Sequence, residues 1–136
     1  MLIAFGPGTR DMLQHAAEKA TLAVLTNKPG AASTQILEGT GLIGFFDQLV
    51  AGDGRWARKP SPQGLQWLVG QAGETPASTL MVGDSIVDLH TARAAGVPIC
   101  LAHYGFGFDT VPLAEITTED WVIDRPAQLL QLLEPR

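Results

Sequence analysis

The sequence has one cysteine, one tyrosine, and no apolar run that approaches the ~20 residues needed to cross a bilayer. A single cysteine, Cys100, excludes an internal disulfide framework and a cysteine zinc cluster, so a reducing cytoplasm is the expected location. Nine lysines and arginines against 14 aspartates and glutamates give a formal charge of −5. We therefore expect neither nucleic acid nor membrane as a partner, because contacts between basic residues and phosphates supply most nucleic-acid affinity.

The remaining composition is that of a globular protein. Apolar residues make up 46% of the 136 residues and charged residues 17%, a balance that excludes wholesale disorder. A chain of this length buries about two thirds of the surface that its unfolded form exposes, which is enough for one core. The sequence therefore predicts a single domain over residues 1–136.

Short apolar runs alternate with longer segments of helical periodicity. Several runs are apolar throughout, as strands are when helices cover both faces of a parallel sheet. We expect a doubly wound, Rossmann-like α/β sheet, in which ligands gather at the carboxyl ends of the strands. The predicted strands are 22–25, 48–51, 79–82, 99–102 and 121–123, and the predicted helices are 9–19, 31–39, 63–72, 85–95 and 126–133.

Two aspartates lie where the strand over 79–82 gives way to a helix. Asp84 follows Gly83 at the strand end, and Asp88 lies about one helical turn further on, so both carboxylates can face one point. Mg²⁺ accepts such oxygens, with water and a substrate phosphate completing its shell. The spacing also fits a structural alternative, in which Asp84 or Ser85 caps the helix and Asp88 favours its first turn.

Two further residues lie where they could bind an anion. Lys59 precedes Pro60 near an expected helix start, where its charge could neutralise a phosphoryl group; the alternative is a solvated surface lysine. Thr26 ends the strand over 22–25, and its hydroxyl and the backbone N–H groups that follow, Asn27 among them, could hold a phosphate oxygen. The alternative for Thr26 is an ordinary turn residue.

In combination these residues resemble a known family. A strand-end Thr, a Lys-Pro and a G-D-S-x-x-D motif, in this order, are similar to the motifs of the haloacid dehalogenase superfamily of hydrolases. The local sequence resembles that of the phosphoglycolate phosphatases within this superfamily, from about Pro7 to the C-terminus. The segments that carry the resemblance are Leu25-Thr26-Asn27-Lys28-Pro29, Arg58-Lys59-Pro60-Ser61-Pro62 and Met81-Val82-Gly83-Asp84-Ser85-Ile86-Val87-Asp88.

The resemblance implies a Mg²⁺-dependent phosphomonoester hydrolase that acts on a small phosphorylated metabolite, 2-phosphoglycolate or a similar ester. It implies that Thr26, Asn27 and Lys59 bind the phosphate, with Thr26 and Lys59 as catalytic residues. It also implies that Asp84 ligates the metal. Asp88 then belongs to the same metal site and orients a ligand or Lys59.

One part of the family's pattern is missing. The resemblance implies an aspartate nucleophile and an acid/base aspartate in a D-x-D-G-T motif, followed by a helical cap, yet the sequence contains no D-x-D. In a first reading, residues 1–8 follow the cap, so the chain is the C-terminal part of the core. In a second reading, Phe5 and Pro7 replace the two aspartates, and Met1–Phe5 forms the central strand of an inactive relative. The distance from Pro7 to Thr26 favours the first reading.

Both readings leave this chain alone catalytically incomplete, because neither Phe nor Pro can attack phosphorus or transfer a proton. The alternative function is a non-catalytic relative that holds Mg²⁺ and phosphate. Without its central strand the sheet would have a slot between the strands that end at Thr26 and Gly83, whose backbone groups need partners. We expect direct pairing across the slot, occupation of it by Met1–Phe5, or self-association through it.

Overall fold

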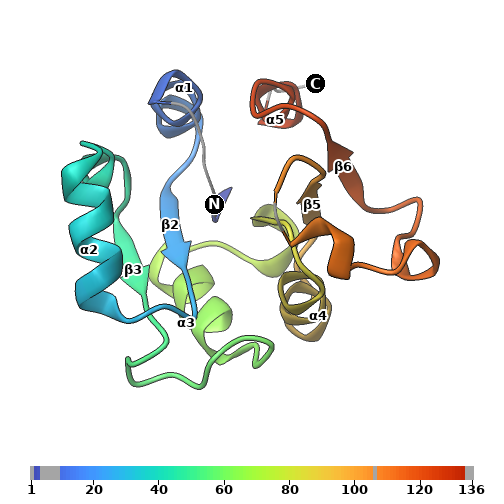
Figure 1. The fold of residues 1–136 in the computed structure, drawn as a ribbon, viewed down its shortest axis with the longest axis horizontal. Helices are drawn as coiled ribbons and strands as arrows, with labels where there is room; N and C mark the ends of the chain where they lie inside the picture. Colours follow the sequence, from blue (N-terminus) through green and yellow to red (C-terminus); the bar gives the residue numbers. More distant parts are fainter. Residues whose placement is uncertain (1, 4–9, 106, 134–136) are drawn as a thin grey trace.

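The computed structural model describes residues 2–3, 10–105 and 107–133. Its strands form one six-stranded sheet in the order β3-β2-β1-β4-β5-β6, with every pairing parallel (Figure 1). The strands are β1 (Leu2–Ile3), β2 (Leu22–Leu25), β3 (Gln48–Val50), β4 (Leu80–Gly83), β5 (Ile99–Ala102) and β6 (Trp121–Ile123). The α-helices are α1 (Arg10–Lys19), α2 (Gly30–Gly39), α3 (Gln63–Gln71), α4 (Ile86–Ala95) and α5 (Gln128–Leu133). The predicted doubly wound α/β class is confirmed.

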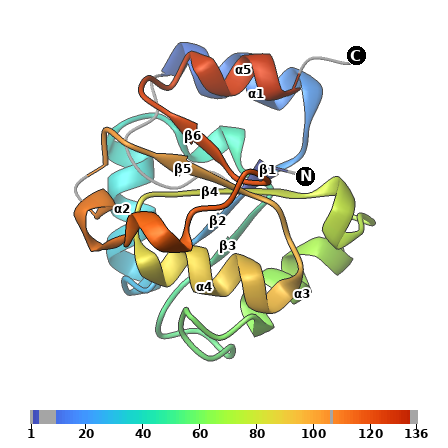
Figure 2. The same ribbon diagram turned by 90° about the vertical axis from the view of Figure 1, so that its right-hand side faces the viewer.

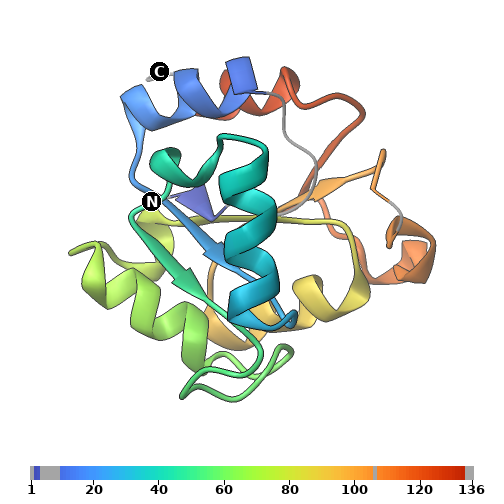
Figure 3. The same cartoon turned by 60° about the vertical axis from the view of Figure 1, so that its left-hand side comes forward.

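The inner strands β2, β4 and β5 are almost wholly buried, as their apolar sequences predict, whereas the edge strands β3 and β6 leave residues exposed. Figure 2 shows α1 and α5 on one side of the sheet and α3 and α4 on the other. Side chains alternate along the strands between two cores. Leu22 and Val82 join the core under α1 and α5, whereas Ala23 and Met81 join the core over α3 and α4. The helix α2 runs beside β2 and β3 (Figure 3).

The centre of the sheet is closed by the beginning of the chain. Leu2 pairs with Leu22 of β2 and with Leu80 of β4, so β1 occupies the slot that the sequence left open. The expectation of a missing central strand is corrected to this extent, and the slot is not free for self-association. Occupation by Met1–Phe5 was one of the three expected outcomes, and it is confirmed for Leu2–Ile3. The rest of the predicted segment 1–8 lies outside the described residues.

Cys100 lies in β5 with no exposed surface. Its burial raises the pKa of the thiol to about 12, because an apolar environment penalises the thiolate. The thiol is therefore protonated at neutral pH and is not a nucleophile. Within the described part of the chain, no helix is long and apolar enough to cross a membrane.

A bidentate ion pair joins α4 to the loop that precedes β6. The Arg93 guanidinium donates to both carboxylate oxygens of Asp120, at 2.7 and 2.6 Å, and the backbone N–H of Thr117 donates to the same carboxylate at 2.9 Å. The hydrogen bond from Arg93, assisted by Thr117, holds the pKa of Asp120 below its ordinary value. The pair therefore stabilises the fold above that ordinary value and loses its effect as the pH falls through the lowered pKa.

We expect Asp120→Asn to lower the free energy of unfolding by about 1 kcal/mol at pH 7, because Arg93 is partly exposed and water screens the pair. The difference between variant and wild type should shrink as the pH falls below about 4, the ordinary pKa of aspartate. Urea unfolding at pH 7 and at pH 3 measures both values. Asp109→Asn, an exposed aspartate, is the matched control. A difference that is independent of pH would contradict this account of the pair.

Candidate functional site

Two loops at the carboxyl ends of β2 and β3 are joined by a reciprocal pair of hydrogen bonds. The Asn27 amide donates to the Lys59 carbonyl at 3.0 Å, and the Lys59 N–H donates to the Asn27 amide oxygen at 2.9 Å. Next to this pair, Gly52 donates its N–H to the Lys28 carbonyl at 2.9 Å. A Cβ on Gly52 would overlap the Asn27 carbonyl, so this close approach requires glycine. Asn27 thus fixes the backbone of Lys59.

Thr26 stands at the end of β2 and is buried. Its backbone N–H donates to the Val50 carbonyl at 2.9 Å, and its hydroxyl accepts from the Lys28 N–H at 3.1 Å. The hydroxyl therefore makes the local turn bond that the structural alternative predicted. It still has a proton to donate, since a threonine hydroxyl can accept and donate at once. The structure agrees with a turn role and is compatible with a phosphate role.

Lys59 is a buried lysine, and the alternative of a solvated surface lysine is wrong. Its ammonium nitrogen lies 2.7 Å from Oδ1 of Asp88, and the two side chains are 5% and 1% exposed. Residues 59 and 88 thus meet at one point, as the motif order indicated. Burial of both partners makes this pair much less screened by solvent than a surface ion pair. The ammonium group is consequently held in one place at the carboxyl edge of the sheet.

Asp88 uses its second oxygen for the strand-to-helix junction. Oδ2 accepts from the backbone N–H of Asp84 at 3.0 Å and from the N–H and hydroxyl of Ser85 at 3.2 and 3.1 Å. Ser85 is the N-cap of α4 and forms a capping box with Asp88. The capping alternative is therefore confirmed for Ser85 and Asp88. It coexists with the ion pair to Lys59.

Gly83 makes this junction sterically feasible. A Cβ at this position would lie 2.5 Å from the Asp88 carboxyl carbon, closer than any real contact. Its φ is not among the positive values, which occur at Gly41, Gly73 and Gly96, so backbone freedom does not explain this glycine. The close approach of Asp88 is the physical reason for glycine here. The positive φ of Gly96, in contrast, belongs to the C-cap of α4.

The two predicted metal ligands differ in what they can offer a cation. Asp84 is half-buried, and its Oδ2 accepts from the Gly107 N–H at 3.2 Å. Its Oδ1 accepts no hydrogen bond from the described residues, so Asp84 fits a hard divalent ion such as Mg²⁺, whose remaining positions water and phosphate can fill. Both oxygens of Asp88 are already engaged. No group of three potential metal ligands exists among the described residues.

Positive charge gathers on the loops that Asn27 joins. Four of the nine lysines and arginines, Lys28, Arg55, Arg58 and Lys59, lie on them. The Arg58 side chain donates to the Gly52 carbonyl at 3.2 Å, and Arg55 stacks on Trp56, 4.4 Å from the ring centroid. This local excess of cations opposes the net negative charge of the chain and favours an anionic ligand at this edge.

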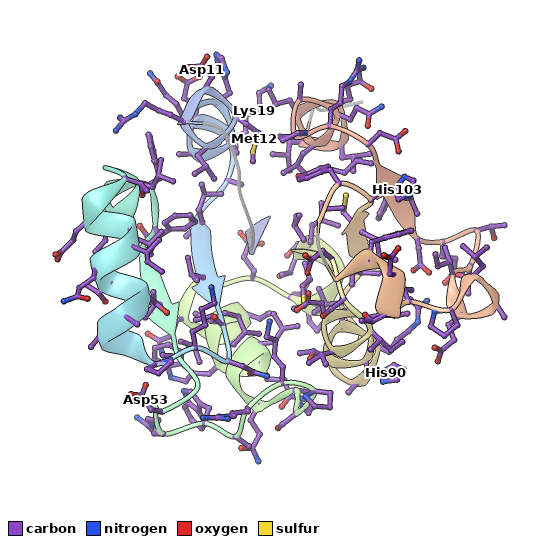
Figure 4. All side chains as sticks on the ribbon, in the orientation of Figure 1. Asp11, Met12, Lys19, Asp53, His90 and His103 are labelled. Carbon is purple, nitrogen blue, oxygen red and sulfur yellow. The ribbon has the colours of Figure 1, made fainter. Side chains whose placement is uncertain are left out.

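Three further side chains, His103, Asp53 and Trp56, make structural contacts. His103 is exposed and contacts Asp124 at 2.9 Å on the side of β5 and β6, whereas Asp53 lies where β2 leads into α2 (Figure 4). Asp53 Oδ1 accepts from the Gly30 N–H at 2.8 Å and so supports the start of α2. Trp56 packs on Trp67 with ring centroids 6.0 Å apart, which explains Trp56 as a packing residue.

The sheet order, the strand-end cluster and the Lys59–Asp88 pair agree with a comparison against protein families. The model of the family described as haloacid dehalogenase-like hydrolase matches residues 2–102. The chain belongs to this family. A phosphoglycolate phosphatase of Haemophilus influenzae is 37% identical over 128 residues, which are 93% of this chain and 56% of the relative. A phosphoglycolate phosphatase of Cupriavidus necator is 40% identical over 114 residues, 84% of this chain and 48% of the relative.

Solved structures give the same result for the fold. A protein of Haemophilus somnus, described as a predicted phosphoglycolate phosphatase, is 31% identical and superposes with a TM-score of 0.83 over 94% of this chain and 56% of its own. A haloacid dehalogenase-type hydrolase of Bacillus subtilis, solved with bound magnesium, is 20% identical, with a TM-score of 0.79 over 92% of this chain and 54% of its own. The chain spans about half the length of the curated relatives it matches.

Proposed function

We propose that this chain carries the phosphate- and Mg²⁺-binding part of a phosphomonoester hydrolase of the phosphoglycolate phosphatase type. The observation that carries the proposal is the buried Lys59–Asp88 pair at 2.7 Å, in which the carboxylate that holds the Lys59 ammonium also accepts from the backbone N–H of Asp84. A cation and a metal-binding carboxylate at one strand edge suit a phosphate dianion, because phosphoryl transfer depends on positioning and charge stabilisation.

Each residue has a distinct role in this proposal. The Lys59 ammonium and the Thr26 hydroxyl donate to phosphate oxygens, and Asn27 holds the Lys59 backbone. Asp84 ligates Mg²⁺, which supplies Lewis-acid stabilisation of charge when bound. Asp88 acts through its neighbours by fixing the Lys59 ammonium and the Asp84 backbone. The substrate is a small phosphorylated metabolite; the names of the relatives favour 2-phosphoglycolate.

This chain alone is proposed to bind without turnover. No D-x-D exists in the sequence, so the 136 residues lack the nucleophile and the acid/base pair that the family resemblance implies. The same absence supports the second candidate function, a non-catalytic relative that holds Mg²⁺ and phosphate. The two readings put Met1–Phe5 in different places, and β1 (Leu2–Ile3) lies in the central slot, the position that the second reading gives to this segment. Residues 4–8, which include Phe5 and Pro7, lie outside the described residues, and that residues 1–8 follow a cap is a proposal of the first candidate.

A pair of assays tests the proposal. Titration calorimetry with Mg²⁺ in the presence of 2-phosphoglycolate should show binding by the wild-type chain and at least tenfold weaker binding by Asp84→Asn, with Asp47→Asn, an exposed aspartate, as the control. Phosphate release by the wild-type chain should equal the blank. A form extended upstream by a D-x-D-G-T motif and cap should hydrolyse the ester if the first candidate holds and should not if the second holds. Turnover by the short chain that Asp84→Asn abolishes would contradict the claim of incompleteness.

A further inference from the structure

The loop that follows β5 reaches back to Asp84. Its described residues near the site are 103–105 and 107–110. The Gly107 N–H donates to Oδ2 of Asp84 at 3.2 Å, and a Cβ on Gly105 would overlap the Asp84 side chain. A Cβ on Gly107 would come within 2.9 Å of the Ser85 Cβ and 3.1 Å of Asp84 Oδ1. Both glycines thus allow the loop to lie directly against this carboxylate.

Thr110 fastens this loop to the start of α4. Its hydroxyl donates to the Gly107 carbonyl at 2.6 Å and accepts from the Ile86 N–H at 2.9 Å. Ile86 is the first residue of α4, and its N–H is one of the donors that a helix start cannot satisfy itself. On the other side of Thr110, the buried side chain of Val111 joins the core over α3 and α4. The loop is therefore anchored at Thr110 and Val111, shortly after Gly107.

The contacts close a ring of hydrogen bonds around Asp84. The ring runs from the Ile86 N–H to Thr110, from Thr110 to the Gly107 carbonyl, and from the Gly107 N–H back to the Asp84 carboxylate. Gly107 engages Oδ2 only, so the orientation that the ring imposes leaves Oδ1 available. A carboxylate that is held in this way has fewer rotamers to lose when it binds a cation.

We propose that Thr110 is a positioning residue for Asp84, and that its hydroxyl raises the affinity of this carboxylate for Mg²⁺ through Gly107. The inference rests on the proposed function, because it assigns the metal to Asp84. Thr110 itself contacts neither metal nor substrate. Its effect is indirect: without the hydroxyl, the link from Gly107 to Ile86 is lost. The Thr110 N–H alone still donates to the Gly107 carbonyl, at 3.0 Å, so the donor to Asp84 Oδ2 is held less firmly.

Magnesium titrations of the full chain, followed by amide NMR signals of Asp84 and Gly107, test the inference. Thr110→Val keeps the shape of the side chain and removes the hydroxyl; we expect about a tenfold higher Kd for Mg²⁺ and faster hydrogen exchange of the Gly107 amide. Thr110→Ser restores the hydroxyl and should return the Kd to within about twofold of wild type. The control is Thr118→Val, another exposed threonine on a surface loop.

A second variant reaches the same carboxylate by another route. Gly107→Ala leaves the Thr110 hydroxyl in place but displaces the loop from Ser85, so it should also weaken Mg²⁺ binding. If Thr110→Val lowers stability and leaves the Kd unchanged, the hydroxyl only caps α4 and the inference is overturned. If the wild-type chain shows no Mg²⁺-dependent shift at Asp84, the metal site of the proposed function fails as well. The two failures are thus distinguishable.

Discussion

Asp88→Ala is expected to lower the free energy of unfolding by about 3–5 kcal/mol, the usual result of breaking one half of a buried ion pair. The substitution removes the carboxylate that Lys59 contacts at 2.7 Å. It also removes the acceptor for the N–H groups of Asp84 and Ser85 at the start of α4. The Lys59 ammonium and these two backbone N–H groups therefore lose their shared partner at the same time. Chemical unfolding of the purified variant measures the change.

Two further variants make the result specific to the buried pair. Asp88→Asn keeps an oxygen acceptor but not the charge. Its free energy of unfolding should therefore lie between the values for wild type and for Asp88→Ala. Asp47→Ala removes an exposed aspartate and should change stability by less than about 0.5 kcal/mol. A loss below about 1 kcal/mol for Asp88→Ala would mean that the Lys59–Asp88 pair does not hold this edge of the sheet together.

Lys59→Met is expected to weaken binding of inorganic phosphate by about tenfold to a hundredfold in the presence of Mg²⁺. A hydrogen bond from a charged donor contributes roughly 1.5–3 kcal/mol, and methionine keeps the length of the side chain without the charge. Stability should fall less than in Asp88→Ala, because Asp88 retains its bonds from Asp84 and Ser85. Phosphate titrations by calorimetry measure the affinity.

The matched control for this prediction is Lys28→Met. Lys28 lies on the neighbouring loop at the same edge of the sheet, and its side chain is exposed. Its removal should weaken phosphate binding only about twofold to threefold, through the long-range field that salt screens. Equal effects of Lys28→Met and Lys59→Met would show that general positive charge, rather than the fixed ammonium of Lys59, attracts the anion.

The fold was predictable because its signals are local and strong. The runs 22–25, 99–102 and 121–123 coincide with β2, β5 and β6. The strands β2 and β5 are buried throughout, as their apolar sequences predict, whereas β6 is an edge strand with Trp121 and Val122 exposed. The helix α5 begins at Gln128 rather than at 126, a boundary that apolar periodicity does not fix. The strand β1 was expected only as one of three outcomes for the slot, because two residues carry no periodicity and the unsatisfied edges of β2 and β4 indicated no more than that something must lie between them.

The sequence predicted which residues form the candidate site, but it predicted fewer of the hydrogen bonds that join them. Motif order brought Lys59, Asp84 and Asp88 to one edge, as the structure shows. Spacing could not reveal that both Asp88 oxygens are engaged, because their partners include backbone groups of neighbouring residues. The contacts of Gly107 and Thr110 were missed altogether. The glycines around position 106 were the available signal, since closely spaced glycines often mark a close approach.

The central claim is that the edge containing Thr26, Lys59 and Asp84 binds Mg²⁺ together with phosphate. An amide NMR titration of the ¹⁵N-labelled chain with both MgCl₂ and inorganic phosphate tests this most directly. We expect the largest shifts at 26–28, 59 and 84–85, and smaller phosphate-dependent shifts when Mg²⁺ is omitted. Saturation of both ligands with shifts confined to other parts of the chain, or no shifts at all, would contradict the claim.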